Sequence, residues 1–145
     1  MKINFTKREY RLLLEMMYLA DWMLHAHEPG SKKDPYHALE QKILSLAREF
    51  GCEDLVEHSA HLNEYCPTQA FEEADTIRGC IEDYDDATFW DELISRLAER
   101  DVFRKHTAEE LARMTGEDRI ALSWRAEESY ADEFKTNGLE RIKIE

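Results

Sequence analysis

The sequence predicts an all-α fold: an irregular bundle of five to seven helices, formed by residues 1–145 as a single domain. The chain has only five Gly and three Pro residues, too few for a protein built from many short strands and turns. Thr6 with Glu9, and Thr107 with Glu110, have the spacing of helix-starting capping boxes. Between such starts, apolar residues recur every three or four positions, as expected for amphipathic helices.

Helix ends are indicated by Gly, Pro and Asn residues, which interrupt the apolar pattern at several places. These stops are Pro29-Gly30, Gly51, Pro67, Gly116 and Asn137-Gly138. Together with the starts they predict helices at 7–27, 35–50, 53–63, 68–85, 88–105, 108–114 and 117–136.

The first predicted helix is apolar around almost its whole circumference between Leu12 and Leu24. Such a helix is usually central in its bundle or covered by a second subunit, so we expect a homodimer. Its polar side carries Tyr18 and Trp22 in helical spacing. These two residues are candidates for a ligand pocket or a protein interface, unless residues 28–34 or another helix cover them.

The two ends of the chain follow a different period. Residues 1–5 and 139–144 alternate between apolar and polar side chains, which is typical of strands. We therefore expect that the termini can form a short two-stranded β-ribbon that closes the bundle, provided that the ribbon packs against the helices.

Histidines are the candidate metal ligands. His58 and His61 lie three residues apart on the predicted helix 53–63, and His25 ends the first helix. With a carboxylate they suit zinc, iron or manganese, so a divalent metal is the one cofactor that the sequence suggests. The alternative is that these residues bind nothing: the chain has no His-Glu-x-x-His motif, and the end of a helix attracts His electrostatically.

A carboxylate interrupts the apolar side of the last predicted helix. Glu127 falls within this inward stripe and is a candidate ligand-binding residue or general acid, because a buried carboxylate must be paired or protonated. Alternatively it pairs with Arg or Tyr, or reaches water at the rim of the stripe. The stripe consists of Ile120, Trp124, Tyr130, Ala131 and Phe134.

Charge and cysteine content narrow the class of protein. The net charge of −13 lies mostly after residue 70 and disfavours binding to nucleic acids and anionic membranes. No apolar run approaches the roughly 20 residues of a membrane-spanning helix, and the start lacks a signal-peptide pattern. Three unclustered cysteines, Cys52, Cys66 and Cys80, fit a reducing compartment, so we expect a soluble cytoplasmic protein.

Three segments, 18–27, 89–93 and 134–144, carry a resemblance to a known group. The stretches YLADWMLHAH, FWDEL and FKTNGLERIKI resemble a family of small bacterial helical proteins to which no function is assigned. The resemblance implies a bacterial origin and no particular activity.

These observations leave three functional hypotheses. The first is a non-catalytic interaction or regulatory protein, homodimeric and able to dock a basic protein partner through the acidic region 72–92. The second is a small metal- or ligand-dependent enzyme that uses His25, His58, His61 and Glu127. The third is an acidic mimic of nucleic acid, which requires carboxylates on one continuous face.

Overall fold

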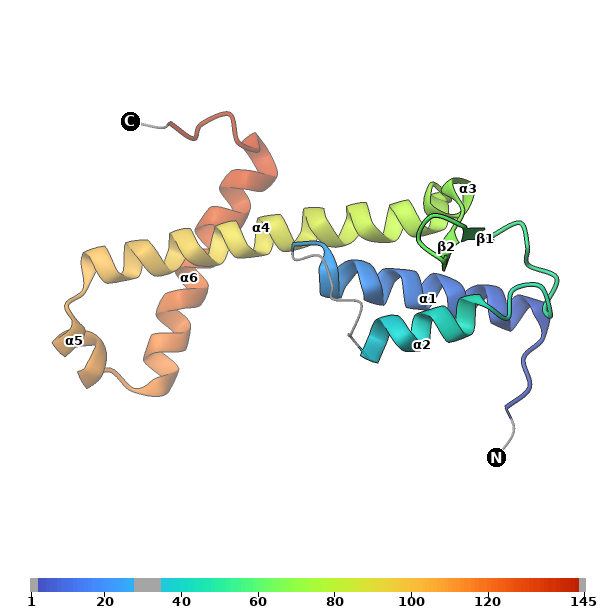
Figure 1. Ribbon diagram of the computed structural model, residues 1–145. Coiled ribbons are helices and arrows are strands. Elements are labelled where there is room, and N and C mark those ends of the chain that lie inside the picture. The colour runs from blue at the N-terminus through green and yellow to red at the C-terminus, as the bar shows by residue number, and fades with distance from the viewer. Residues whose placement is uncertain (1–2, 28–34, 144–145) are drawn as a thin grey trace. The chain divides into compact units, whose positions relative to one another are not determined.

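The computed structural model describes residues 3–27 and 35–143 (Figure 1). Within this range the chain forms six helices and one two-stranded antiparallel sheet, so the predicted mostly helical class with a small β-ribbon is confirmed. The chain divides into two compact units, Met1–Asp83 and Tyr84–Glu145. We describe the two units separately.

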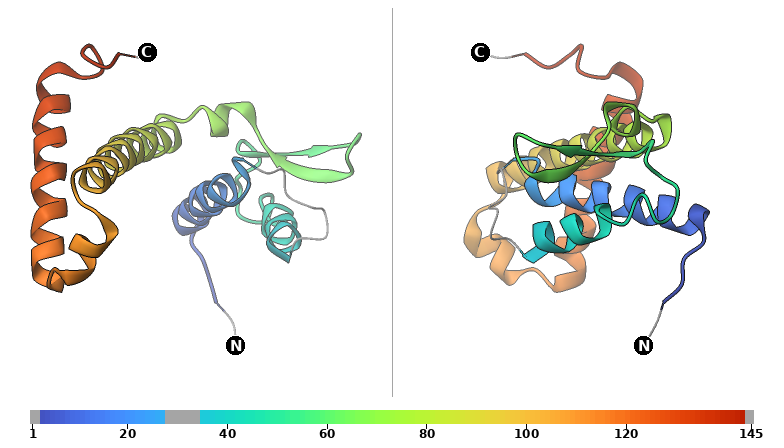
Figure 2. Two further views of the ribbon diagram at one scale, coloured as in Figure 1. Left: turned by 90° about the vertical axis from the view of Figure 1, so that its left-hand side faces the viewer. Right: turned by 45° about the vertical axis from the view of Figure 1, so that its right-hand side comes forward.

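The first unit combines helices with the only sheet found in the described residues. Helices α1 (Lys7–His25) and α2 (Pro35–Leu44) contact each other, and α2 contacts strand β2 of the hairpin (Figure 2). The hairpin consists of β1 (Val56–Ser59) and β2 (Glu64–Pro67); the short helix α3 (Gln69–Glu72) and the start of α4 (Asp75–Lys105) follow it. The core of this unit consists of Tyr10, Leu14, Leu44, Ala47, Cys52, Val56, Phe71 and Ile77.

Helix α1 begins at the predicted capping box. The Thr6 hydroxyl accepts a hydrogen bond from the Glu9 amide, and the Glu9 carboxylate accepts one from the Thr6 amide at 2.8 Å. One turn later, Tyr10 is almost completely buried. Its ring stacks on Phe50 with the ring centroids 4.3 Å apart, and its hydroxyl donates to the Ile43 carbonyl at 2.7 Å. This residue therefore ties α1 to the end of α2.

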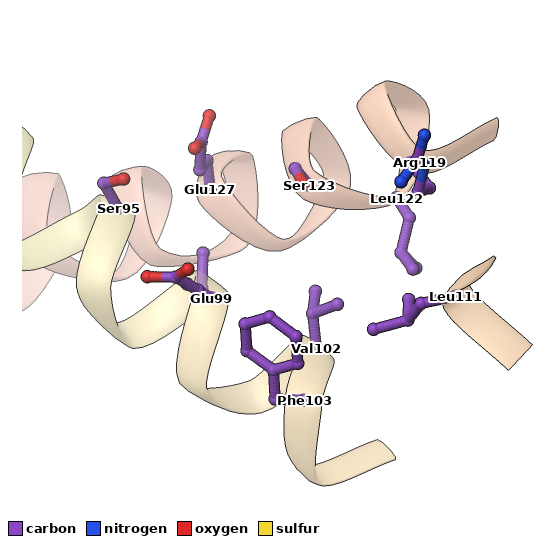
Figure 3. Close-up of a pocket in the computed structure, with 10 residues that line it drawn as sticks. Ser95, Glu99, Val102, Phe103, Leu111, Arg119, Leu122, Ser123 and Glu127 are labelled. Atoms are coloured by element: carbon purple, nitrogen blue, oxygen red, sulfur yellow. The ribbon is translucent and has the colours of Figure 1, made fainter. Parts of the chain in front are cut away.

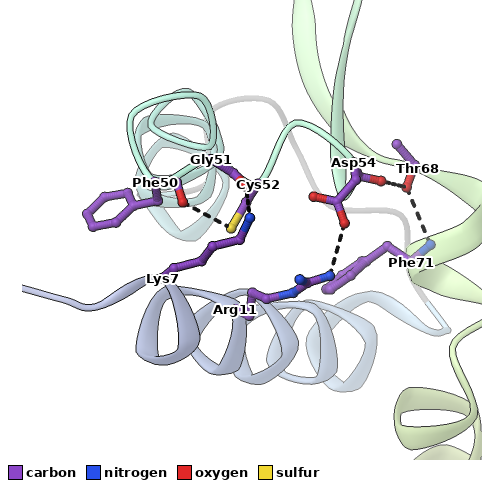
Figure 4. A network of polar contacts seen from close by, with 8 residues as sticks. All are labelled: Lys7, Arg11, Phe50, Gly51, Cys52, Asp54, Thr68 and Phe71. Carbon is purple, nitrogen blue, oxygen red and sulfur yellow. Dashed lines mark hydrogen bonds and ion pairs between the residues drawn. The ribbon is translucent and has the colours of Figure 1, made fainter.

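The predicted helix 35–50 ends earlier than expected, because the chain after Leu44 passes into a series of turns. Gly51 closes these turns in the left-handed region, with φ of 64°, which Gly adopts without strain. The Lys7 ammonium group donates to the Gly51 carbonyl, and Arg11 pairs with Asp54 at 3.0 Å (Figure 4). These contacts hold the turn segment against α1.

The prediction of a helix over 53–63 is wrong, because these residues supply the first strand and the turn of the hairpin. Val56 pairs with Pro67 and Ser59 with Glu64, and Asn63 in the turn has a positive φ of 56°. The two-stranded ribbon is therefore internal rather than terminal. Residues 3–5 and 139–143 contain no strand, and the remaining residues of the expected terminal ribbon lie outside the described part of the chain.

The predicted break between 85 and 88 is also absent. Helix α4 runs without interruption through the boundary between the units, since no Gly or Pro lies between Asp85 and Thr88 to end it. The second unit contains the rest of α4, α5 (Ala108–Arg113) and α6 (Gly116–Asn137). Both later helices start at Thr caps, as predicted for 108–114 and 117–136.

Aromatic and polar contacts join α4 to α6 in the second unit. The Trp90 and Phe134 rings lie 5.5 Å apart, and Phe134 is buried. Further along, the Tyr130 hydroxyl donates to the Asp101 carboxylate at 2.6 Å and accepts from Arg100 at 3.2 Å. The hydrogen bond from Tyr130, together with that from Arg100, lowers the pKa of Asp101.

Candidate functional site

A pocket lies between α4, α5 and α6 in the second unit (Figure 3). Its volume is about 420 Å³, in the range of small-molecule and peptide side-chain pockets. The side chains of Val102, Phe103, Leu111 and Leu122 point toward one another and form its apolar part (Figure 3). We call this hollow the α4–α6 pocket.

The polar lining of the α4–α6 pocket includes the predicted candidate Glu127. This residue is half-buried on α6, and Glu99 approaches the same hollow from α4. Arg119 and Ser123 lie two turns and one turn, respectively, before Glu127 on α6 and also line the pocket. The pocket thus combines an apolar wall with two carboxylates and one guanidinium group.

A second hollow of about 470 Å³ lies on the other side of the row Arg119, Ser123 and Glu127. It is also lined by Ile120 and Trp124, whose side chains are 55% and 68% exposed. The prediction that Ile120 and Trp124 face inward is therefore wrong. The inward side of α6 passes instead through Leu122, Tyr130 and Phe134, so the first turns of the helix present their large apolar residues to solvent.

The first unit holds a smaller hollow between α1 and α2. Its volume is about 180 Å³, and its lining is apolar except for Asp21 and Glu40. His37 lies between two carboxylates, with its Nδ1 atom 3.5 Å from Glu40 and its Nε2 atom 3.7 Å from Glu64. Burial and then the Asp21 carboxylate raise the pKa of Glu40, while His37 and His25 oppose the rise.

The predicted metal ligands lie on different elements. His25 ends α1 and pairs with Asp21 at 2.8 Å, His58 lies on β1 with its ring 4.9 Å from that of Tyr65, and His61 is in the hairpin turn. Among residues 3–27 and 35–143, no group of three or more His, Cys, Asp or Glu residues is placed to hold a metal ion. The metal site stays a prediction without support from this geometry.

The candidate aromatic residues of α1 are both half-buried. Tyr18 packs edge-on against Phe71 with the ring centroids 5.9 Å apart, and burial is the main cause that raises the pKa of its hydroxyl. Trp22 is likewise half-buried. Phe71, which belongs to α3 and to the core, therefore covers part of the Tyr18 ring.

Three exposed apolar side chains of α1 share a face that differs from the face of Tyr18. Leu12, Met16 and Met23 are 50%, 68% and 58% exposed. Each residue of a helix is rotated by roughly 100° from the one before it, so these three side chains fall within about 40° of Met16. Ala20 lies on the same face and is also exposed. We call these four residues the outer α1 stripe.

The acidic residues of α4 are distributed around the helix. Glu82, Asp83, Asp85 and Asp86 are all exposed, and with about 100° between successive residues they point to several sides. The Asp86 carboxylate also accepts a hydrogen bond from the Trp90 indole at 3.1 Å. This arrangement gives no support to a continuous phosphate-like face.

The thiol of Cys66 is not activated for nucleophilic attack. Cys66 is half-buried on β2, and burial raises its pKa, with Glu64 and Glu57 acting in the same direction. Cys52 lies in the core, so neither thiol is a candidate catalytic group.

Sequence reasoning missed Glu99, Phe103, His37 and Glu40. The first two lie on the predicted helix 88–105, and they reach the α4–α6 pocket only because α5 and α6 fold back toward α4 (Figure 3). The apolar pair Val102 and Phe103, four residues before the Thr107 cap of the next helix, was the available signal of a covered helix end.

No protein-family model matches the chain, and neither curated proteins nor solved structures give a significant match. None of the helices in the described part of the chain is both long enough and apolar enough to cross a lipid bilayer. The function must therefore be inferred from the surfaces and pockets themselves.

Proposed function

We propose that this protein is a non-catalytic interaction protein that forms a homodimer through the outer α1 stripe. The observation that carries the proposal is the exposure of Leu12, Met16 and Met23 on one face of a helix whose opposite face is in the core. Contiguous exposed apolar surface of this kind is typical of protein–protein interfaces.

The stripe suits contact with a second copy of itself. A two-fold dimer uses the same face of both subunits, so each side chain of the stripe is buried in both copies of the chain. Ala20, between the larger residues, leaves room for close approach of two helices. Methionine is flexible and adapts to the shape of an opposing surface, which favours Met16 and Met23 as contact residues.

The expected contribution of Met16 can be worked from its exposure. Full burial of a Met side chain contributes about 1.5–3 kcal/mol, so burial of the 68% that is exposed contributes about 1–2 kcal/mol in each subunit. The Met16→Glu change removes this term from both subunits. A loss of about 2–4 kcal/mol weakens the dimer about 30-fold to 1,000-fold.

Size-exclusion chromatography with light scattering tests the proposal. Wild-type protein is expected at twice the 17.1 kDa chain mass at micromolar concentration, and Met16→Glu at the mass of one chain. Ile120→Glu is the matched control, since it places the same charge at a comparably exposed apolar residue on α6. A wild-type mass of one chain, or an unchanged dimer in Met16→Glu, would contradict the proposal.

The His37–Glu40 pair supports a second candidate function, a small ligand- or metal-dependent enzyme. A carboxyl group with a raised pKa beside a small pocket is a typical general acid, and Glu40 meets both conditions. Elemental analysis of untagged protein purified without chelator tests its metal-dependent form. Near-stoichiometric metal that is lost in His37→Ala would favour the enzyme. Metal-free protein would contradict the hypothesis of a metal-dependent enzyme.

A further inference from the structure

The α4–α6 pocket offers an apolar surface that its own helices leave partly uncovered. Phe103 lies at its wall and is 61% exposed, while Val102, Leu111 and Leu122 beside it are half-buried. An aromatic ring left this open gains by contact with an apolar side chain from outside. The pocket is large enough, at about 420 Å³, to accept one.

The charged groups of the pocket are free to bind a partner. Within the described residues, no hydrogen bond or ion pair engages the carboxylate of Glu99 or of Glu127. Other carboxylates of the same unit are engaged, such as Asp101 by Tyr130 and Glu110 by Thr107. Two unengaged carboxylates beside an apolar wall form a surface that a cation on an apolar stem complements.

Charge decides the kind of occupant. The chain carries a net charge of −13, and the pocket has two carboxylates against the one guanidinium group of Arg119. This balance repels phosphate-rich partners such as nucleic acids and anionic membranes, and it attracts basic polypeptides. The exposed Trp124 of the adjoining hollow adds an aromatic face for a Lys or Arg side chain.

We propose that the α4–α6 pocket binds a cationic amphipathic segment of a partner protein. An apolar side chain of that segment packs against Phe103 and Leu122, and a neighbouring Lys or Arg pairs with Glu99 and Glu127. The inference deepens the proposed interaction role by naming the chemistry of the partner. It does not require the dimer, since the pocket and the outer α1 stripe share no residue.

Isothermal titration calorimetry with three synthetic helical peptides tests the ligand chemistry. A peptide of Leu and Lys in amphipathic order is expected to bind saturably, with one site per chain, and to weaken as salt is added. The same peptide with Glu in place of Lys, or with Ser in place of Leu, is expected to bind at least about tenfold more weakly, because each lacks one of the two recognised features. Equal binding of the Leu–Glu peptide would overturn the proposal.

Variants of α6 and α4 locate the site. Glu99→Gln and Glu127→Gln keep the shape of each side chain and are each expected to weaken the Leu–Lys peptide by about threefold or more. Glu128→Gln is the matched control, since it removes the same charge from an exposed neighbour outside the pocket. Circular dichroism verifies that the variants fold. If Glu128→Gln weakened binding of the Leu–Lys peptide as much as the pocket variants do, the attraction would be a general effect of charge, and the assignment of the site to the α4–α6 pocket would be overturned.

The Met16→Glu variant separates this inference from the proposed homodimer. Peptide binding by Met16→Glu at wild-type affinity is the expected result, whatever its oligomeric state. Loss of peptide binding in this variant would overturn the assignment of the site to the α4–α6 pocket alone. A monomeric wild type that still binds the Leu–Lys peptide contradicts only the dimer.

Discussion

Replacing Tyr10 by Phe removes one hydroxyl group and leaves the buried ring in place, which separates hydrogen bonding from packing in the first unit. The hydroxyl donates to the Ile43 carbonyl at 2.7 Å, and that carbonyl also accepts from the Leu46 amide at 3.0 Å. The acceptor therefore keeps a partner in the variant. We expect Tyr10→Phe to lower the free energy of unfolding by about 0.5–1 kcal/mol, at the low end for a lost hydrogen bond.

Tyr10→Ala removes the ring as well and leaves a cavity against Phe50 and Leu14. Tyr10 is 1% exposed and stacks on Phe50 at 4.3 Å, so little surrounding structure is free to fill the space. The expected loss is about 3–5 kcal/mol, as for other large aromatic residues in cores. Urea denaturation followed by circular dichroism measures both variants. If Tyr10→Phe cost as much as Tyr10→Ala, packing would not be the main contribution of this residue.

The wild type and Tyr10→Phe should also differ in how their stability depends on alkaline pH. Burial, with smaller effects from Cys52 and Glu49, raises the pKa of Tyr10 to about 12 from its ordinary value of 10.0. A raised pKa in the folded state means that the stabilisation is fully present below pH 10.0 and is lost as the pH rises toward about 12. Tyr10→Phe has no such group, so its stability should fall less over this interval.

Three further substitutions test local features. Tyr130→Phe removes the hydrogen-bond donor that lowers the pKa of Asp101. Because the pKa of Asp101 in the folded protein lies below its ordinary value, this carboxylate stabilises the fold at neutral pH and loses that effect in acid. The melting temperature of Tyr130→Phe should therefore fall less from neutral to acidic pH than that of the wild type. Thr107→Ala should cost about 1 kcal/mol in urea denaturation by removing the cap of α5, while Thr107→Ser should retain it, and equal losses would refute the capping role. Gly51→Ala should destabilise by about 1–2 kcal/mol because φ is +64°, whereas Gly79→Ala in α4 meets open space and should be neutral or stabilising in thermal melts.

Helix starts could be predicted because capping is a local interaction. Thr6 and Thr107 each satisfy amides within three residues, so the spacing in the sequence carries the information. Both bounds of α5 and of α6 lie within one residue of the predictions, and each of these helices starts at a Thr cap. The length of α4 was underestimated because Thr88, which resembles a cap, lies in a segment where no other residue ends the helix.

The hairpin could not be predicted from local spacing, since its strands of four residues show too little alternation. Its position depends on distant contacts: the Gln41 side chain donates to the Tyr65 carbonyl at 2.8 Å and accepts from the Tyr65 amide at 2.8 Å. The Thr68 amide also donates to the Leu55 carbonyl. These bonds select extended structure in a segment where His58 and His61 alone suggest a helix face.

The sequence pattern singles out Glu127, but the residues that surround it in the structure could not be predicted from that pattern. The interruption of an apolar stripe by a carboxylate is visible in the sequence. The residues that complete the pocket, Glu99 and Phe103, come from a helix more than twenty positions earlier. Only the return of α6 toward α4 brings them together (Figure 3). Trp124 is exposed because α6 packs against α4 with a different side, the one that carries Leu122, Tyr130 and Phe134.

Oxidation of individual methionines tests the central claim, burial of the outer α1 stripe against a second copy, most directly. Peroxide treatment followed by peptide mass spectrometry is performed at concentrations below and above dimer formation. Met16 and Met23, 68% and 58% exposed in one chain, should be protected at high concentration, while the half-buried Met114 of the second unit should react equally at both. Equal oxidation of Met16 and Met23 at the two concentrations would contradict self-association through this face.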